Sequence, residues 1–268
     1  MTIELEKTHY GKVRPLFESI FYAQNLVGAV FEGNHAGHIL VDNPQQPESA
    51  LVAPACEYFF TAGRPDNPAF NTAMRNWLLS HWASPEGELL LFPGSAAWQA
   101  SLDVLFADFE CLHITRKVFD FNRERFEADH KGWQTQIPGG YTLRRYDHHL
   151  TLGTGLPELW GSLDRFLKHG VGFAILHKAE VVSRCHTVMV GNGKAEISIE
   201  TAEGYRRMGW ATLTASAFID ACLAQGLHPA WSCWDNNYPS QMLAKKLGFT
   251  RPVDVPVLYV QIKKPNSS

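Results

Sequence analysis

The sequence has no long hydrophobic run and no excess of basic residues. No stretch approaches the roughly 18 to 20 apolar residues that a transmembrane helix needs. The N-terminus MTIELEKTHYGK lacks the apolar core of a signal peptide. A net charge of -3 gives no electrostatic reason to expect a nucleic-acid surface. We therefore expect a soluble, cytoplasmic protein that binds neither nucleic acid nor a membrane.

Regularly spaced cysteine pairs are also missing. The five cysteines are odd in number, scattered and without a CxxC motif, which argues against a disulfide framework and a structural zinc site. The histidines His148, His149, His177 and His186 have no partner at helical spacing, so we expect no metal site. The thiols expected to be buried and reduced are Cys56, Cys111, Cys185, Cys222 and Cys233.

The two common nucleotide-binding signatures are absent. Neither GxxxxGK[ST] nor a GxGxxG after the first predicted strand occurs, so nucleoside triphosphate and dinucleotide sites lack their residues. What is present is a globular composition, with 45% hydrophobic and 19% charged residues over 268 positions. That length favours two modules of ordinary size.

The second half of the chain predicts the order β α β β β α β α β. Hydrophobic periodicity and turn residues give the elements. In chain order these are a connecting helix followed by a turn at 120–138, a strand at 141–147, a helix at 156–170, three antiparallel strands within 171–201, a buried helix closed by Gly226, a strand at 229–233, a helix ending at Gly248 and a last strand at 253–262.

The first half repeats part of this order. GHILVDN, SALVAPACEYFFTAG, GELLLFPG and HITRKVFDF indicate strands, and two helical segments lie between them, giving β β α β α β. Few residues are identical, so convergent alternation stands as the alternative to a duplicated fold. The copies differ at one turn, where the first has TAGRPDNPAF and the second EGYRRMGWAT.

The segment ETAEGYRRMGWAT at 200–212 follows a predicted strand and opens a predicted helix. Backbone amides and the helix dipole would welcome an anion there. Gly209 and the small Ala211 would let a phosphate approach the backbone, and Arg206 and Arg207 would add charge-assisted hydrogen bonds. A basic first turn of a buried helix is the competing interpretation of these residues alone.

Two motifs in order resemble the GNAT family of N-acetyltransferases. Its signature [QR]xxGx[GA] is present as Arg206, Gly209 and Ala211 after the strand AEISIET, and NNYPSQMLAKKLGF resembles its later helix. More narrowly, the sequence resembles a bacterial two-part branch that includes zwittermicin-type resistance acetyltransferases. The resemblance is specific over 170–250 and only architectural over 1–130.

The resemblance implies an α/β (α+β) GNAT fold, in which a mixed, mostly antiparallel twisted sheet carries helices on both faces. It implies a degenerate amino-terminal copy at 1–128 and a catalytic domain at 129–268. The strand ending at Thr201 and the strand at 229–233 would separate and leave unpaired backbone groups for acetyl-CoA, the implied cosubstrate. The implied cofactor-binding residues are Ile199, Glu200, Thr201, Arg206, Arg207, Met208, Gly209, Trp210, Ala211, Thr212, Asn237 and Ser240.

Candidate catalytic residues follow from what acyl transfer needs. The reaction requires a neutral amine, an N–H directed at the thioester oxygen and a proton for the leaving thiolate. Glu200 and Glu196, four residues apart on one strand, are the candidate bases, although each is equally compatible with a solvated strand edge. Many family members carry a tyrosine acid where this sequence has Ala244. The proton donor is therefore open among Tyr238, Ser240 and water.

Other conspicuous residues have ordinary structural interpretations. Trp210, Trp231 and Trp234 are expected to pack, although Trp234 is also compatible with substrate contact. Cys233 has no predicted His and Asp partners for a covalent role. Two residues of the middle strand, Ser183 and Cys185, face either the acceptor cavity or the core, and alternation does not decide which.

Three functions compete at this point. The leading hypothesis is an N-acetyltransferase that moves acetyl from acetyl-CoA to a primary amine of a small molecule by direct attack in a ternary complex. The second is a non-catalytic CoA-binding or interaction protein, and the third a dimerisation module in which the basic turn meets a carboxylate. The acceptor is open among antibiotics, amino sugars, polyamines, amino acids and protein N-termini, and the oligomeric state between monomer and homodimer.

Overall fold

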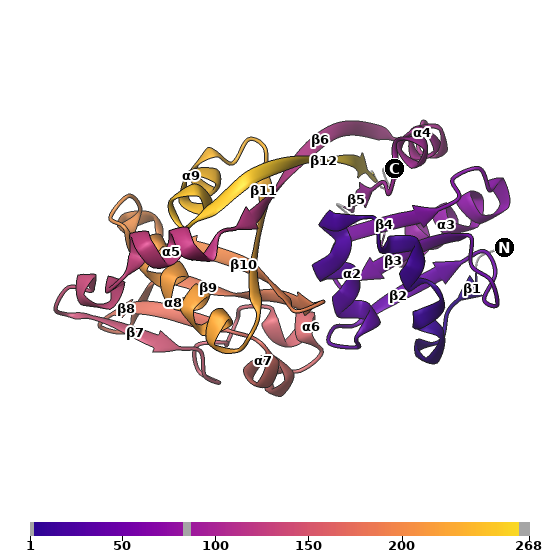
Figure 1. Ribbon diagram of the computed structural model, residues 1–268. Helices are drawn as coiled ribbons and strands as arrows, with labels where there is room; N and C mark the ends of the chain where they lie inside the picture. Colours follow the sequence, from indigo (N-terminus) through magenta and orange to yellow (C-terminus); the bar gives the residue numbers. More distant parts are fainter. Residues whose placement is uncertain (1–2, 83–86, 263–268) are drawn as a thin grey trace, which may run out of the picture. The chain divides into compact units, whose positions relative to one another are not determined.

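A computed structural model describes residues 3–82 and 87–262, which divide into two compact units (Figure 1). Unit 1 takes the described residues up to Arg116 and from Asp254 onward, and unit 2 takes Lys117–Val253. Strand β6 (Glu110–Phe121) begins in unit 1 and ends in unit 2, whereas β12 (Phe249–Gln261) runs the other way. Each unit is thus completed by a strand from the other half of the chain.

Unit 1 is a sheet with the order β1-β2-β3-β4-β5-β12. Its pairings are antiparallel except between β4 and β5, which are parallel. The other elements of this unit, in chain order, are β1 (Ile3–Glu4), η1 (Lys7–Lys12), α1 (Arg14–Phe17), η2 (Phe21–Ala23), α2 (Gln24–Phe31), β2 (Gly37–Val41), β3 (Ser49–Pro54), β4 (Tyr58–Gly63), α3 (Pro68–His81), β5 (Glu88–Phe92) and α4 (Ala96–Leu105).

Unit 2 is a sheet with the order β6-β11-β10-β9-β8-β7. Strands β7 to β10 pair antiparallel, as the sequence predicted for the last three of them, and β10 pairs parallel with β11. Its remaining elements, in chain order, are α5 (Arg123–His130), η3 (Trp133–Gln136), β7 (Tyr141–Arg145), α6 (Leu156–Trp160), α7 (Leu163–His169), β8 (Gly172–His177), β9 (Glu180–Gly191), β10 (Lys194–Thr201), η4 (Glu203–Tyr205), α8 (Trp210–Ala224), β11 (His228–Trp234) and α9 (Tyr238–Lys246).

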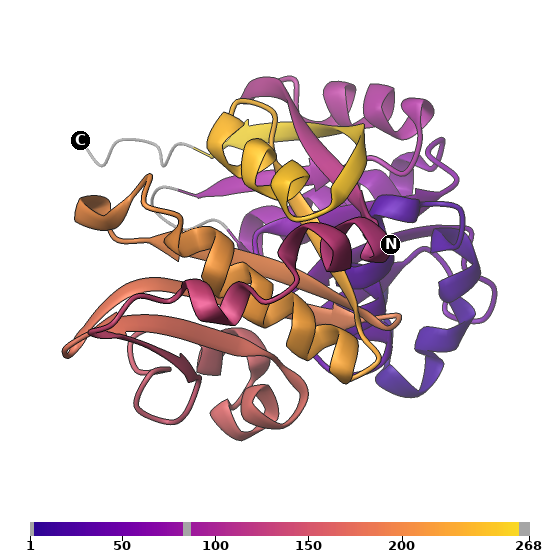
Figure 2. The same cartoon turned by 60° about the vertical axis from the view of Figure 1, so that its left-hand side comes forward.

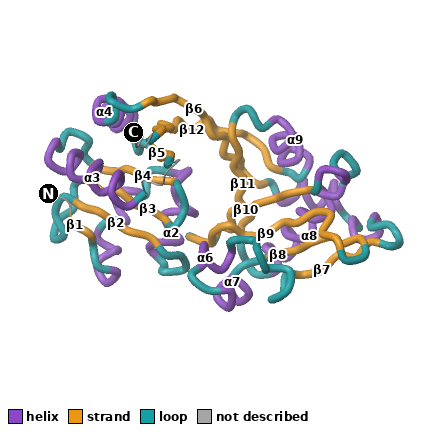
Figure 3. The backbone as a smooth tube through the Cα atoms, turned by 180° about the vertical axis from the view of Figure 1, so that it is seen from behind, coloured by secondary structure: helices purple, strands orange, loops and turns teal. Residues whose placement is uncertain are grey.

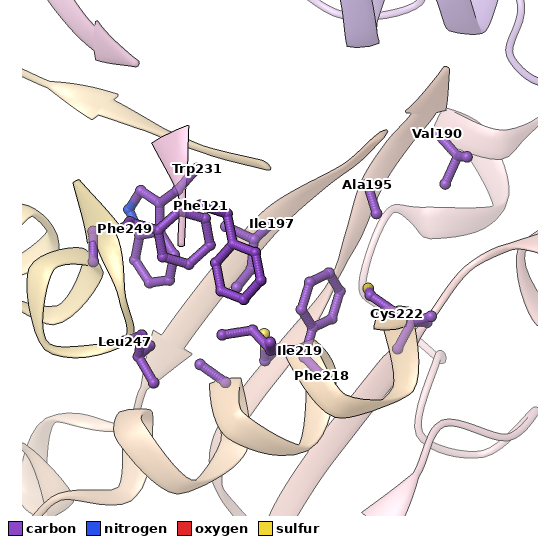
Figure 4. Packing of buried hydrophobic residues seen from close by; sticks show 14 of the residues in the cluster. Phe121, Val190, Ala195, Ile197, Phe218, Ile219, Cys222, Trp231, Leu247 and Phe249 are labelled. Carbon is purple, nitrogen blue, oxygen red and sulfur yellow. The ribbon is translucent and has the colours of Figure 1, made fainter. Parts of the chain in front are cut away.

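Helix α8 lies across the strands of unit 2 and is apolar nearly all round, as a buried helix must be (Figure 1). Figure 4 shows its residues Phe218, Ile219 and Cys222 pointing toward Ala195 and Ile197 of β10. The short helices α6 and α7 lie on the other side of the sheet (Figure 2), next to the strand face seen from behind in Figure 3. The mixed sheet with helices on both faces is therefore confirmed.

Two predicted elements were wrong in detail. The helix expected over 156–170 is broken into α6 and α7, because Gly161 adopts a left-handed conformation (φ +73°) and Ser162 caps a new helix by accepting from the Arg165 amide. The segment SALVAPACEYFFTAG, predicted as one strand, forms the two antiparallel strands β3 and β4. Both halves consequently share the order β β β α β α β, namely β2 to β6 and β8 to β12 with their helices.

The compact units divide the chain differently from the predicted ranges 1–128 and 129–268. Packing separates the units at Arg116, and the strand β12 returns to unit 1. The ranges stay a prediction about duplicated copies, whereas the units describe which residues pack together. Within residues 3–82 and 87–262, no helix is long and apolar enough to span a bilayer.

Candidate active site

Strands β10 and β11 separate after three paired residues. The parallel pairs run from Lys194 with His228 to Glu196 with Ala230, and the described residues show no further pair, although β10 continues to Thr201. On the edge of β10 that faces β11, the backbone groups of its last residues therefore have no strand partner among the described residues. The separation predicted from the resemblance is thus confirmed, and it provides an edge to which an extended ligand can bind.

The first turn of α8 begins beside this opening without a side-chain cap. Gly209 occupies the N-cap position at φ +89°, and Arg207 also lies in the left-handed region. A Cβ built on Gly209 would meet nothing within 4 Å, so the turn faces open space. The unsatisfied amides of this turn, together with the helix dipole, favour an anion.

One cavity of about 860 Å³ joins the open end of β10 to the first turn of α8. Every cofactor-binding residue that the resemblance implied lines it except Met208, whose side chain is 59% exposed. The lining residues are Ile199, Glu200, Thr201, Glu203, Tyr205, Arg206, Arg207, Gly209, Trp210, Ala211, Thr212, Asn237, Pro239, Ser240, Leu243 and Lys246. Two chain segments separated by some 25 residues thus meet in one cavity.

Five lining residues were not predicted from the sequence. Glu203 and Tyr205 lie in the short turn η4, and Pro239, Leu243 and Lys246 lie on α9 or at its end. The three on α9 recur at helical spacing with Ser240, so the face of that helix carried a signal that could have found them. The turn η4 carried no such signal, because its position depends on how the chain leaves β10.

Positive charge gathers at the cavity. Arg206, Arg207 and Lys246 line it and form no ion pair within the part of the chain that the structure describes. Arg206 Nε donates to the carbonyl of Thr201 at 3.3 Å, which holds this side chain against the end of β10. Glu200 and Glu203 are the opposing charges at the same cavity. The net local charge suits a polyanion, although the whole chain is acidic.

The candidate bases lie in different surroundings. The Glu200 side chain is 69% exposed, lines the cavity and lies 3.6 Å from Nε of Arg184. Glu196 is 5% exposed at the last paired position of β10, and its Oε1 accepts from the Ser232 hydroxyl. Both carboxylates therefore flank the point where the strands part, one open and one enclosed.

The candidate proton donors are also separated by the structure. Tyr238 is 69% exposed and does not line the cavity, and Ala244, at the family's tyrosine position, is buried in the core. Ser240 does line the cavity, and its Oγ accepts from Trp231 Nε1 at 3.1 Å. Since a hydroxyl both accepts and donates, the Ser240 O–H can still donate a hydrogen bond to a ligand.

The residues with ordinary interpretations are mostly packing residues. Trp210 stacks on Tyr141 at 4.2 Å between ring centroids, and Trp231 is 1% exposed in the core. Cys185 faces the core, where burial raises its thiol pKa well above the usual value. Ser183 is likewise buried, and its hydroxyl donates to the carbonyl of Glu200 at 3.0 Å. This hydrogen bond holds β9 against β10, the strand that lines the cavity.

The corresponding place in unit 1 is filled. A Cβ on Gly94 would lie 2.3 Å from the carbonyl oxygen of Thr61, at the end of β4. Trp98 Nε1 donates to the next strand-end carbonyl, that of Gly63, at 2.9 Å. Helix α3 is capped by Asn67, whose side chain accepts from the Phe70 amide. In unit 1, protein groups therefore occupy the strand end and the start of the helix, whereas both are open in unit 2.

Comparison with known proteins identifies the family. The profile described as GNAT acetyltransferase matches residues 14–258. The chain belongs to the GNAT acetyltransferase family. This GNAT chain is also 28% identical over 262 residues to the uncharacterized N-acetyltransferase YdfB of Bacillus subtilis (strain 168), covering 96% of this chain and 97% of the relative. It is thus an acetyltransferase by family.

Solved structures agree with this GNAT assignment. A GNAT-like protein from Streptococcus suis matches with a TM-score of 0.72 and 25% identity, covering 95% of this chain and 99% of that one. A tandem GNAT protein from the clavulanic acid biosynthesis pathway matches with a TM-score of 0.60 over 100% of this chain and 99% of that one, at 13% identity. The second likeness shows the fold alone. The narrower resemblance to zwittermicin-type enzymes stays a prediction.

Proposed function

We propose that the chain transfers an acetyl group from acetyl-CoA to a primary amine of a small molecule, by direct attack within a ternary complex. The observation that carries this proposal is the cavity in which the open edge of β10, the uncapped start of α8 and three cations meet, none of which forms an ion pair with another described residue. An acyl-CoA presents amides along its pantetheine arm and phosphates beyond it, so each part of the cavity has a matching group.

The residues present fit this cosubstrate. Backbone groups of Ile199, Glu200 and Thr201 would bind the pantetheine arm as an added strand, and the amides that follow Gly209 would bind the pyrophosphate, with Arg206 supplying charge. Open space at Gly209 is the structural observation behind this fit. When bound, the thioester supplies the acetyl group to be transferred.

The chain's own residues supply the proton transfers. Glu200 lines the cavity and accepts the proton of the attacking amine, directly or through water, while the enclosed Glu196 keeps the point of strand separation polar. Ser240 donates a hydrogen bond to the departing sulfur, since its oxygen is already fixed by Trp231, and the thiolate then takes its proton from water. All of these groups lie within the predicted domain 129–268, whereas the corresponding place in unit 1 is filled.

Isothermal titration calorimetry with acetyl-CoA tests the proposal. We expect saturable binding by the parent protein and at least a tenfold loss of affinity in the Arg206→Ala/Arg207→Ala variant, because a charge-assisted hydrogen bond contributes about 1.5–3 kcal/mol. Arg145→Ala is the control, since Arg145 is exposed on β7 and does not line the cavity. Absence of saturable binding, or equal affinity in all three proteins, would contradict the proposal.

A non-catalytic CoA-binding protein is the second candidate, favoured by one observation. The family's tyrosine acid is replaced by Ala244, which is fully buried. An alanine at this position cannot donate a proton to the leaving thiolate. Thiol release from acetyl-CoA, measured against a panel of amines, separates the two functions. Binding without any amine-dependent thiol release supports the second candidate, and turnover supports the acetyltransferase.

A further inference from the structure

The sheet face of unit 2 that points away from α8 carries a row of polar side chains. Strand pairing places Arg184 of β9 directly opposite Glu200 of β10, and His186 opposite Ser198. Between them Cys185 is fully buried on the α8 side of the sheet, where the Cys222 thiol of that helix acts on it. Because side chains alternate along a strand, the two polar pairs point to the opposite side, where α6 and α7 lie (Figures 2 and 3).

This row is recessed. The Arg184 side chain is 35% exposed, and Glu196, on the same face of β10, is nearly buried. Tyr146 covers the neighbouring glycine: a Cβ on Gly172, which pairs with His186, would lie 2.7 Å from Cγ of Tyr146. We call these residues, together with Ser198 and Glu200, the polar floor. The Glu200 end of the polar floor is the open one, since that side chain is 69% exposed.

Two donor groups meet at one end of the polar floor. The Tyr146 hydroxyl lies 3.5 Å from Nδ1 of His186, and burial raises the pKa of Tyr146, so the hydroxyl keeps its proton. Burial, and after it the positive charge of Arg184, lowers the pKa of His186 to about 4, so this ring is neutral at pH 7. The positive charge of Arg184 acts on both groups, and a guanidinium and a phenol O–H are suitable donors for a carboxylate.

The guanidinium of Arg184 is only loosely held. Its Nε lies 3.6 Å from Oε2 of Glu200, beyond hydrogen-bond distance, and no second ion pair of Arg184 occurs among residues 3–82 and 87–262. A partly exposed pair of this kind contributes little to stability. A ligand carboxylate could therefore replace the Glu200 carboxylate beside Arg184 and accept two parallel hydrogen bonds from the guanidinium. Glu200 would then be released toward the cavity that it lines.

We propose that the polar floor is the acceptor site and that it takes an amino-acid-like acceptor, an amine that also carries a carboxylate. Arg184 and the Tyr146 hydroxyl bind the carboxylate, and Glu200 faces the amine beside the acyl-CoA cavity. A plain diamine would instead bring a second ammonium group next to Arg184, and like charges at that distance repel. The inference rests on the proposed acetyl transfer, which it deepens by naming the class of acceptor.

The test compares matched acceptors. Thiol release from acetyl-CoA is measured with a set of L-amino acids and with the carboxamide of each, on the full chain. We expect at least one amino acid to be turned over with a kcat/KM tenfold or more above that of its carboxamide. Arg184→Gln should bring this ratio close to one by raising KM for the acid, Arg184→Lys should restore part of it, and Arg145→Gln should leave it unchanged.

Calorimetry with acetyl-CoA accompanies each variant and keeps the two proposals distinguishable. Unchanged acetyl-CoA affinity in Arg184→Gln shows that the variant is folded. Turnover of carboxamides or plain amines as fast as of amino acids, turnover of no amino acid at all, or an unaltered ratio in Arg184→Gln would overturn the amino-acid inference while acetyl transfer could stand. Loss of acetyl-CoA binding in the parent protein would instead remove both.

Discussion

Glu196 and Glu200 show how position along one strand separates two residues of the same type. Both lie on the polar face of β10, but Glu196 sits where the strand is still paired and is nearly buried, whereas Glu200 lies beyond the last pair and is mostly exposed. Only Glu200 lines the cavity. The sequence alone did not distinguish the two carboxylates, because the local residue pattern does not show at which residue the pairing between two strands ends.

Glu200→Gln should therefore slow the chemical step and leave cosubstrate binding intact. We expect kcat to fall by about 10²-fold or more, as is typical when a general base is removed, with acetyl-CoA affinity within a factor of two or so of the parent. Glu203→Gln, also at the cavity but at the turn η4, is the matched control and should keep kcat. A parent-like kcat in Glu200→Gln would remove Glu200 from the mechanism.

His186 should make the folded state sensitive to acid. Burial and the charge of Arg184 lower its pKa from 6.5 to about 4, so between these values the unfolded chain binds a proton that the folded chain does not. Stability is therefore full above about pH 7 and falls as the pH drops toward 4, by about 2–3 kcal/mol from this residue.

Urea denaturation of the parent and of His186→Gln between pH 7.5 and 4 measures this effect. The free energy of unfolding of the variant should depend less steeply on pH. The pKa of His228 is also lowered by burial, but this residue is present in both proteins, so the difference between the two curves belongs to His186. Parallel curves would show that His186 is not held neutral in the fold.

Among the elements, helix α8 contributes both to the core of unit 2 and to the proposed anion site. Its apolar sides pack under the sheet, and its first turn begins at a glycine that faces open space. Gly226, just past the other end of the same helix, shares the left-handed conformation (φ +72°) and also faces open space. Of the two glycines, Gly209 lines the cavity and Gly226 does not.

This likeness gives a matched pair of variants. Gly209→Ala and Gly226→Ala should each destabilise the fold by about 1 kcal/mol, because a side chain disfavours positive φ. Only Gly209→Ala should weaken acetyl-CoA binding, since its methyl group would enter the space offered to the phosphates. Urea denaturation and calorimetry measure the two effects. Equal affinities in the two variants would contradict a phosphate site at the start of α8.

Local patterns predicted most elements of this fold, and non-local pairing limited the rest. The helix after Gly209, its end at Gly226 and the parting of the strands at 201 and 229–233 are confirmed, since each depends on nearby residues or on the recognised motif. The break at Gly161 was missed because glycine is tolerated inside a helical pattern. The exchange of β6 and β12 could not be predicted, because strand partners far apart in sequence leave no periodic signal.

At the scale of the whole molecule, the exchanged strands tie the two halves of the sequence together in folding. The core of unit 2 includes Phe119 and Phe121 of β6 and Phe126 of α5, all of them before residue 129. The ring of Phe121 packs both with Phe126 and with Phe249 at the start of β12. Two halves that each folded independently would not need to exchange strands in this way.

A fragment spanning 129–268 should consequently fail to fold cooperatively. It lacks three buried phenylalanines, each of which contributes about 3–5 kcal/mol in a core, and their sum is comparable with the whole stability of a domain. Near-ultraviolet circular dichroism and urea denaturation report the outcome, and a fragment starting at residue 110 should regain part of the signal. A sharp unfolding transition in the shorter fragment would show that the predicted boundary is also a folding boundary.

The central claim is that the cavity between β10, α8 and α9 binds acetyl-CoA for acetyl transfer. Calorimetry of the full chain with acetyl-CoA, for the parent, Arg206→Ala/Arg207→Ala and Arg145→Ala, tests it most directly. The account predicts saturable binding that the double variant loses by tenfold or more and that the Arg145 variant retains. A parent protein that shows no saturable binding, or three proteins with the same affinity, would contradict it.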